Sequence, residues 1–309
     1  MLHLCLFCNA QEVTVTRGAL TNDPNLKMNR MLGGDDNSFY CYRIRSKGKG
    51  TSFIVEKYDK KTMQPIFSKD LGNEGSEDTK IIDIKYINDE VYVFRREWEK
   101  KAKLMHLYYQ KVSSEGVVST ELKELISIPS EKYEFIDIEV FDNPSKSKIL
   151  VKACHKPTKE AQYKTEFIAY NAADMSQAWK KSYDMKLRGY NMEALSGMIA
   201  MVTGVVLDLG AASYVGLYFD DNDNIYFGNS KSLKKTKTDP ELYRLVLSII
   251  KGGSDVKQEL ELKFDVDYLV EDIEFCKIND NEIIVGGFFK DVVERKGFDF
   301  IDCGVFSFF

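Results

Sequence analysis

The fold is indicated most clearly by an Asp- and Asn-rich run, Asp220-Asp221-Asn222-Asp223-Asn224, which leads directly into Ile225-Tyr226-Phe227. Asp and Asn tolerate the positive φ angles of tight turns, and a β-branched and aromatic run after such a turn is typical of a hairpin strand. The same order recurs four more times, with Gly34 to Ser38 before Phe39, Asn88 to Glu90 before Val91, Asp142 to Pro144 ahead of Ile149, and Asn279 to Asn281 ahead of Ile283. We therefore expect five hairpins along the chain.

The hairpins recur at an interval of 52, 58, 76 and 58 residues, measured between Phe39, Val91, Ile149, Ile225 and Ile283. After each hairpin a polar loop leads to a third β-rich run, and the first four units continue into a fourth; in one unit these runs are 242–250 and 256–264. The runs before the turns share a pattern as well, namely Ile82-Asp83-Ile84, Ile136-Asp137-Ile138 and Glu271-Asp272-Ile273. Such periodicity predicts repeated four-stranded antiparallel units.

With these units the chain resembles the β-propeller superfamily, specifically the loosely repeated exported propeller-like proteins of bacteria, whose degenerate blades are about 50 residues long. The resemblance implies an all-β fold of about five four-stranded blades. These would cover approximately residues 27–72, 80–128, 134–186, 213–264 and 269–309, all within one domain of residues 11–309. No recurring Trp-Asp dipeptide or Ser-x-Asp-x-Gly box occurs, and Gly286-Gly287 has no counterpart in the other units.

The last unit ends after its third predicted strand, at Val305-Phe306-Ser307-Phe308-Phe309. One interpretation is that 12–16, an N-terminal strand without a unit of its own, supplies the missing outer strand and closes a ring of five blades. The other is an incomplete six-bladed ring, because bare aromatics at the end of the chain would leave an apolar edge exposed.

The long interval of 76 residues contains a mostly apolar insertion, 187–212. Its apolar run, 198–207, is shorter than the roughly 20 residues that span a bilayer, so we expect no transmembrane segment. Two interpretations stay open: a buried helix beginning at Asn191 and followed by a strand from Val205, or an apolar insertion that faces a partner.

The composition is globular, with 44% apolar and 29% charged residues, and the formal charge of the 309 residues is −5. Nucleic-acid-binding domains usually carry a basic excess, so we expect no specific nucleic-acid partner. Leu2 to Phe7 is apolar and Cys8-Asn9-Ala10 precedes Gln11, which together resemble the end of a secretory signal. We therefore interpret 1–10 as the remnant of a signal peptide and expect an exported chain, periplasmic, cell-surface or secreted.

Few residues offer catalytic or metal chemistry. None of His3, His106 and His155 has a neighbour at ligand spacing, and no Walker, Rossmann or Gly-x-Ser-x-Gly motif occurs, so we expect neither a metal nor a cofactor. Asp220 to Asn224 lacks the glycine and the closing glutamate of a calcium-binding loop. We therefore interpret this segment as a hairpin turn. Cys41, Cys154, Cys276 and Cys303 lie in strand-like runs, where we expect free, buried thiols.

Asp83, Asp137 and Asp272 precede the strands that line the central channel of a propeller. Three carboxylates there are candidate catalytic residues, suited to binding a cation or to acid–base work on a glycan. The alternative is structural, with each aspartate hydrogen-bonded to backbone at the end of a strand.

Charge separates by loop type. In a propeller, loops between second and third strands emerge on one side; the windows 45–50, 95–103, 155–164, 231–241 and 290–296 hold 18 basic and 7 acidic residues. The turns between first and second strands emerge on the other side; the windows 35–38, 88–90, 142–148, 220–224 and 279–282 hold 10 acidic and 2 basic residues. The candidate binding residues on the Lys-rich loop face are Arg95, Arg96, Trp98, Lys231, Lys234, Lys235 and Lys237. An acidic glycan, an anionic surface or an acidic protein is the expected partner, and ordinary solvated loops are the alternative, since 34 Lys accompany only 9 Arg.

These features predict a non-enzymatic, exported binding or scaffold module that engages a ligand or partner through the Lys-rich loop face. The rival hypothesis is a carbohydrate-active hydrolase or lyase that uses carboxylates at the central channel. A third hypothesis is a structural surface protein whose apolar insertion docks a partner.

Overall fold

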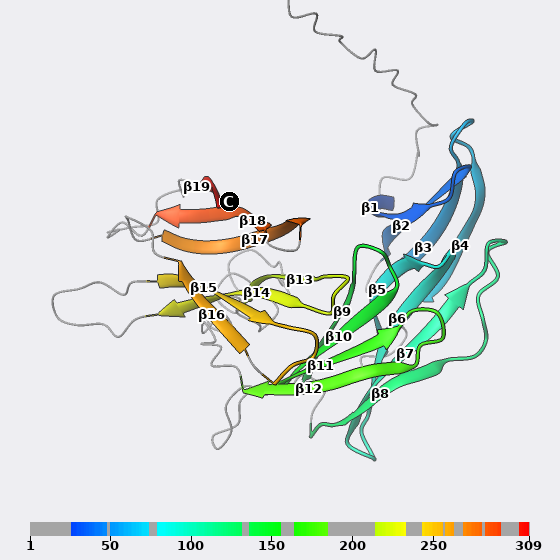
Figure 1. The fold of residues 1–309 in the computed structure, drawn as a ribbon. Helices are drawn as coiled ribbons and strands as arrows, with labels where there is room; N and C mark the ends of the chain where they lie inside the picture. The colour runs from blue at the N-terminus through cyan, green and yellow to red at the C-terminus, as the bar shows by residue number, and fades with distance from the viewer. Residues whose placement is uncertain are drawn as a thin grey trace, which may run out of the picture. The chain divides into compact units, whose positions relative to one another are not determined.

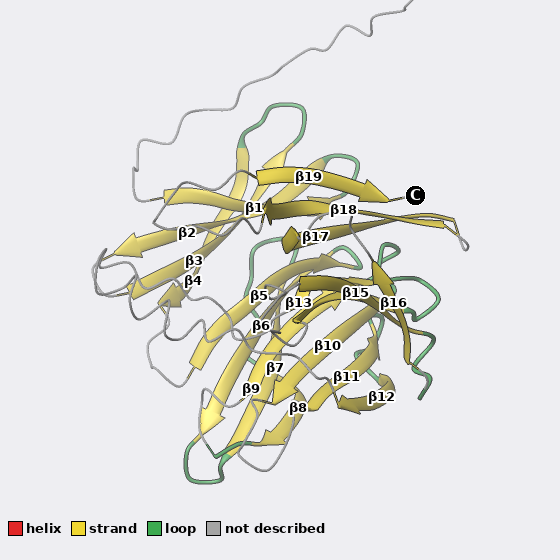
Figure 2. Cartoon of the chain, turned by 90° about the vertical axis from the view of Figure 1, so that its left-hand side faces the viewer, coloured by secondary structure: helices red, strands yellow, loops and turns green. Residues whose placement is uncertain are grey.

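The computed structural model of the chain describes residues 26–47, 50–73, 79–131, 136–155, 164–184, 214–232, 243–255, 257–262, 268–279, 282–291 and 303–308. Every regular element in these ranges is a β-strand, as Figure 2 shows, and none is a helix. No helix long and apolar enough to cross a membrane is therefore found in these ranges. The expected leader, 1–10, and the insertion, 187–212, lie outside the described residues.

The strands form five antiparallel sheets, numbered here as blades 1 to 5 in chain order (Figure 1). Blade 1 comprises β1 (Leu26–Gly34), β2 (Ser38–Lys47), β3 (Gly50–Asp59) and β4 (Pro65–Asn73). Blade 2 comprises β5 (Thr79–Ile87), β6 (Glu90–Glu99), β7 (Leu104–Val112) and β8 (Lys123–Pro129). Blade 3 comprises β9 (Ile136–Asp142), β10 (Lys148–His155), β11 (Lys164–Asn171) and β12 (Gln177–Asp184). Blade 4 comprises β13 (Tyr214–Phe219), β14 (Ile225–Ser232), β15 (Tyr243–Ile250) and β16 (Lys257–Leu262), and blade 5 comprises β17 (Tyr268–Asn279), β18 (Glu282–Asp291) and β19 (Cys303–Phe308).

Each blade is a meander in which consecutive strands are hydrogen-bonded neighbours. Blades 1 to 4 have four strands each, and blade 5 has three in the described residues. Repetition of a four-stranded antiparallel meander is the construction of a β-propeller. The predicted all-β propeller fold of repeated four-stranded units is therefore confirmed.

The chain divides into two compact units. One holds Met1–Glu77, Ile84–Tyr92 and Lys111–Thr120, and the other holds Asp78–Asp83, Val93–Gln110 and Glu121–Phe309. The contacts between blades given below each lie within one of these units.

The Asp- and Asn-rich hairpins form for two reasons. The Asp side chain accepts hydrogen bonds from backbone N–H groups of the turn, and Asp and Asn tolerate positive φ. In blade 1 the Asp35 carboxylate accepts the backbone N–H groups of Asn37 and Ser38, at 2.8 and 2.7 Å. In blade 2 both Asn88 and Asp89 have positive φ, 48° and 61°. Two consecutive residues at positive φ suit the right-handed twist of a hairpin.

A second repeated turn joins the third and fourth strands. Met63, Gly116, Met175 and Gly253, one in each of blades 1 to 4, have φ of 55°, 81°, 59° and 66°. The backbone N–H of Met63 donates to the Asp59 carbonyl, and that of Met175 donates to the Asn171 carbonyl, both at 2.8 Å. In blades 1 and 3 the turn therefore has one sequence pattern, Tyr-Asp/Asn-x-x-x-Met.

Neighbouring blades bury each other's faces. Phe167 of blade 3 and Phe227 of blade 4 share one core, with ring centroids 6.1 Å apart. In the other unit Tyr40 of β2 stacks on Tyr86 of β5 with centroids 4.9 Å apart. Middle strands are covered on both faces where blades pack together; in β10 six consecutive residues are buried.

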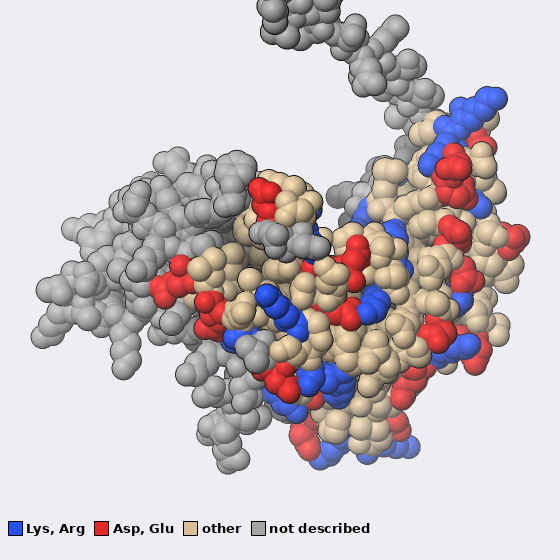
Figure 3. Space-filling view, viewed as in Figure 1, with Lys and Arg blue, Asp and Glu red and all other residues tan. Residues whose placement is uncertain are grey.

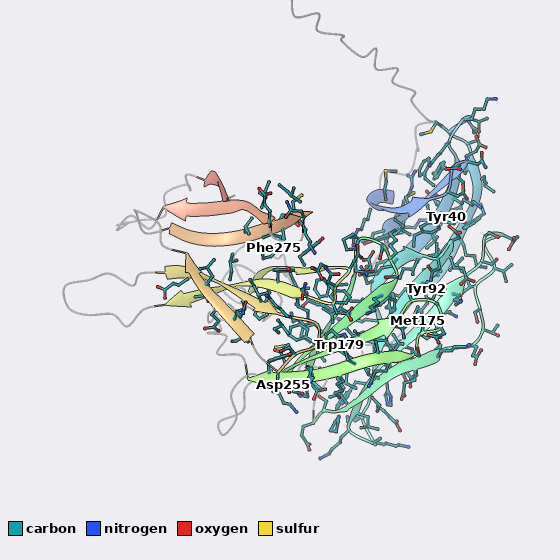
Figure 4. The ribbon with its side chains drawn as sticks, in the orientation of Figure 1. Tyr40, Tyr92, Met175, Trp179, Asp255 and Phe275 are labelled. Atoms are coloured by element: carbon teal, nitrogen blue, oxygen red, sulfur yellow. The ribbon has the colours of Figure 1, made fainter. Side chains whose placement is uncertain are left out.

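An outer-strand aromatic side chain packs on the next blade's left-handed glycine. Trp179, labelled in Figure 4, lies over Gly253, where an added Cβ would come within 2.9 Å of the indole. Phe67 of blade 1 lies over Gly116 of blade 2 in the same way, also at 2.9 Å. Around Trp179, the Tyr183 hydroxyl donates to the Ser254 carbonyl and Lys181 pairs with Asp255 at 2.6 Å.

Three cysteines, Cys41, Cys154 and Cys276, are free thiols. Cys41 and Cys154 are buried as expected, and burial raises the pKa of the Cys41 thiol to about 11. Cys276 is exposed, which corrects the expectation of a buried thiol. It lies on β17, an edge strand of the blade 5 sheet.

Replacing Gly253 with alanine should lower the free energy of unfolding by about 1–3 kcal/mol, because the new Cβ meets Trp179 and the backbone has positive φ. Gly72→Ala is the matched control: its φ is +89° but nothing lies within 4 Å, so only the backbone cost of about 1 kcal/mol applies. Urea denaturation of both variants measures the difference, and equal losses would show that the Trp179 contact contributes nothing.

Candidate functional site

Because consecutive strands run antiparallel, the connections between them alternate between the two ends of each sheet. The first-to-second and third-to-fourth connections lie at one end, here called the turn end, and the second-to-third connection lies at the other, here called the loop end. The acidic windows of the sequence fall at turn ends and the basic windows at loop ends. The question is which of these charged side chains are free to meet a ligand.

At the turn end of blade 4 the Asp220 side chain is fully engaged. Its carboxylate accepts the backbone N–H groups of Asn222 and Asn224 at 2.9 and 2.8 Å, which confirms the predicted turn. The Lys277 ammonium of blade 5 donates to it at 2.9 Å. Burial alone would raise the pKa of Asp220, but the hydrogen bonds from Lys277 and Asn224 outweigh it, so that the pKa lies below its usual value.

Other turn-end acids join blades 3 and 4. Asp223 pairs with Lys148 at 2.5 Å, and both side chains are largely buried. The Asp221 carboxylate accepts hydrogen bonds from the backbone N–H and the hydroxyl of Ser145, at 3.1 and 2.7 Å. These carboxylates therefore have structural partners in place of a ligand.

Asp220→Asn should lower the free energy of unfolding at pH 7 by about 3 kcal/mol, because Lys277 loses a buried counter-ion. The depressed pKa of Asp220 contributes stability above the unfolded-state value of about 3.9, and that contribution is lost as the pH falls through the folded-state pKa. The difference between wild type and variant should therefore shrink below pH 4. The control is Asp36→Asn, which replaces an exposed aspartate in the hairpin turn of blade 1. If Asp220→Asn lowers the free energy of unfolding no more than this control does, Asp220 does not stabilise the contact between blades 4 and 5.

At the loop end of blade 2 the structure brings three predicted site residues into a structural cluster. Arg96 lies 3.9 Å from the Asp137 carboxylate and donates to the Ile136 carbonyl at 3.4 Å. The indole N–H of Trp98 donates to the Ser130 carbonyl at 3.2 Å. Arg96 and Trp98, expected to bind a ligand, thus tie β6 to the chain segment that enters blade 3.

The tip of the same hairpin carries lysines that, unlike Arg96, are exposed. Lys100 and Lys101 are exposed, and neither has a hydrogen bond or ion pair within the described ranges. Lys103 pairs with Glu131 at 2.7 Å, and in blade 3 Lys164 and Lys180 both pair with Glu166, at 3.2 and 2.8 Å. Basic and acidic side chains are interspersed over the face shown in Figure 3.

For the remaining predicted site residues the structure gives only a strand position or a degree of burial, or does not describe them. Asp83 is half-buried on β5 and Arg95 is half-buried on β6. Lys231 lies on β14 opposite Arg244, and Asp272 lies on β17 opposite Phe288. Lys234, Lys235 and Lys237 lie outside the described residues. The described ranges hold no cluster of three or more His, Cys, Asp or Glu side chains arranged to hold a metal ion.

Sequence reasoning missed the environment of two buried polar side chains. Lys152 on β10 is buried and paired with Glu139, its register neighbour on β9 and two residues from Asp137. A single lysine inside the apolar run Ile149 to Cys154 was the available signal, because a buried charge needs a partner. The second is His106, which lies between two glutamates.

No protein-family model matches the chain, and no curated protein matches it. Among solved structures, it is similar to the β-propeller domain of a trilobed protease from Pyrococcus furiosus, at 9% identity and a TM-score of 0.44, covering 93% of this chain and 69% of that one. It is also similar to polysaccharide lyase Uly1, at 11% identity and a TM-score of 0.47, covering 90% of this chain and 56% of the lyase. A third similar structure is an endo-arabinase from Bacteroides thetaiotaomicron, at 11% identity and a TM-score of 0.37, covering 92% of this chain and 93% of the arabinase. The chain thus spans little more than half of the lyase.

Proposed function

We propose that this chain is a non-enzymatic binding module, exported from the cell, that engages an anionic partner through the loop ends of its blades. The observation that supports this proposal is the contrast between the two ends. Turn-end acids such as Asp220 and Asp223 are bonded within the fold, whereas Lys100 and Lys101 at a loop end are exposed and without partners in the described residues.

Exposed lysines suit this role physically. An unpaired ammonium on a hairpin tip attracts anions over a distance of about a Debye length. Because it has no ion pair within the fold, it breaks none when it binds an anion. Arg96 and Trp98 support the site indirectly, since their bonds to the segment 130–137 hold the hairpin that carries Lys100 and Lys101. Lys231, near the end of β14, and Lys234, Lys235 and Lys237, which follow it in the sequence, are assigned to the same function in this proposal. An acidic glycan is the partner that we favour.

A carbohydrate-active hydrolase or lyase is the second candidate. Asp137 and Glu139 lie two residues apart on edge strand β9, so both side chains point to the same face, and they are 33% and 36% exposed. Two carboxylates flanked by Arg96 and Lys152 are a plausible acid–base pair. Asp83 and Asp272 stay candidates in this hypothesis.

Replacing Lys100, Lys101, Lys231, Lys234, Lys235 and Lys237 with glutamine should weaken binding to an acidic glycan about tenfold or more, equivalent to about 1.4 kcal/mol. Binding of heparin and polygalacturonate is measured by calorimetry at low and high salt, with vesicles containing phosphatidylserine as a separate arm. The expected affinity falls as salt rises, because the contacts are exposed charges.

Lys61→Gln with Lys251→Gln is the matched control, since both lysines are exposed at turn ends. Equal weakening by the control, or no binding of wild type to either glycan, contradicts the proposal. Cleavage of a glycan by wild type that Asp137→Asn abolishes while folding is retained favours the enzyme instead. N-terminal sequencing of the chain recovered from cells tests export, with Gln11 as the expected first residue.

A further inference from the structure

His106 is a buried imidazole held between two carboxylates. It lies on β7 with only 7% of its surface exposed. Its Nδ1 is 2.8 Å from Glu124 Oε2 on β8, and its Nε2 is 3.5 Å from Glu99 Oε2 at the end of β6. Nε2 has no hydrogen-bond partner. Buried polar atoms are nearly always bonded, so an unbonded ring nitrogen that faces a carboxylate needs an explanation.

Negative charge gathers around this imidazole. Tyr108 stacks on the His106 ring at 5.5 Å. Burial raises the pKa of Tyr108, and the charges of Glu97, Glu124 and Glu99 raise it further. None of the three is paired with Lys or Arg in the part of the chain that the structure describes. Two of these carboxylates, Glu99 and Glu124, face the ring nitrogens of His106, an arrangement that attracts a cation.

The distances fit a metal ion between two of these groups. Zinc binds imidazole nitrogen and carboxylate oxygen at about 2.0–2.2 Å, so two ligands at a tetrahedral angle are about 3.4 Å apart. The separation of His106 Nε2 and Glu99 Oε2 is 3.5 Å. A metal-bound histidine commonly donates its other ring N–H to a carboxylate, which is the relation of Nδ1 to Glu124.

We propose that this cluster on blade 2 binds a divalent transition metal of the zinc type, with His106 Nε2 and the Glu99 carboxylate as protein ligands. Glu124 is the positioning residue, because its hydrogen bond leaves Nε2 free to coordinate. Since no three such ligands already converge in the described residues, water completes the coordination. An imidazole ligand favours zinc-type ions over calcium and magnesium, which prefer oxygen.

Zinc chloride is titrated by calorimetry into chelator-treated full-length chain carrying Cys5→Ser and Cys8→Ser, so that the N-terminal thiols cannot bind it. We expect one zinc ion per chain, and a visible absorption spectrum when cobalt replaces it. Glu99→Gln should weaken binding at least about tenfold, and Glu124→Gln about 10- to 100-fold. His155→Gln, a histidine of another blade, is the control and should leave binding unchanged.

Glu99→Gln is the deciding variant, because its carboxylate is 53% exposed and its replacement leaves the fold intact even if His106→Gln fails to fold. Unchanged zinc affinity in Glu99→Gln overturns the proposal, as does the absence of stoichiometric binding by the parent chain. Binding lost equally in His155→Gln also overturns it.

Discussion

A four-stranded sheet has two apolar faces, and it can remove both from water only by packing against neighbouring sheets. That constraint governs most of this structure. In the middle strand β10 six consecutive residues are buried, and the faces of blades 3 and 4 share one core. At the ends of the blades, Asp220, Lys277 and Lys148 form the ion pairs that join one blade to the next, and the charge buried on a middle strand, Lys152 of β10, has a partner in Glu139.

The charged side chains at the two ends of the blades differ in how they are bonded. A carboxylate buried at a joint is stable only with enough donors around it, and Asp220 has them from its own turn and from Lys277. Such a group has no capacity left for a ligand. At the loop-end hairpin of blade 2, Arg96, Trp98 and Lys103 are bonded to the segment that follows the blade, whereas Lys100 and Lys101 have no partner in the described residues.

The fold could be predicted from the sequence because tight turns followed by β-rich runs recur five times, at intervals of 52 to 76 residues. Asp, Asn and Gly mark these turns in the sequence. The turn pattern of Tyr58 to Met63 and Tyr170 to Met175 was also available, but its left-handed residue is methionine, a type that does not signal such a turn. The partners of Arg96, Lys152 and His106 were not predictable. They depend on register across strands and on contact between blades, which periodicity does not specify.

The central claim is that acidic turn-end side chains join neighbouring blades, and the Lys148–Asp223 pair tests it most directly. A double-mutant cycle with Lys148→Met and Asp223→Asn compares the free energies of unfolding of the two single variants and the double variant. The account predicts a favourable coupling energy of about 1 kcal/mol or more, as found for directly interacting residues. A coupling near zero, with the two losses simply adding, would contradict it.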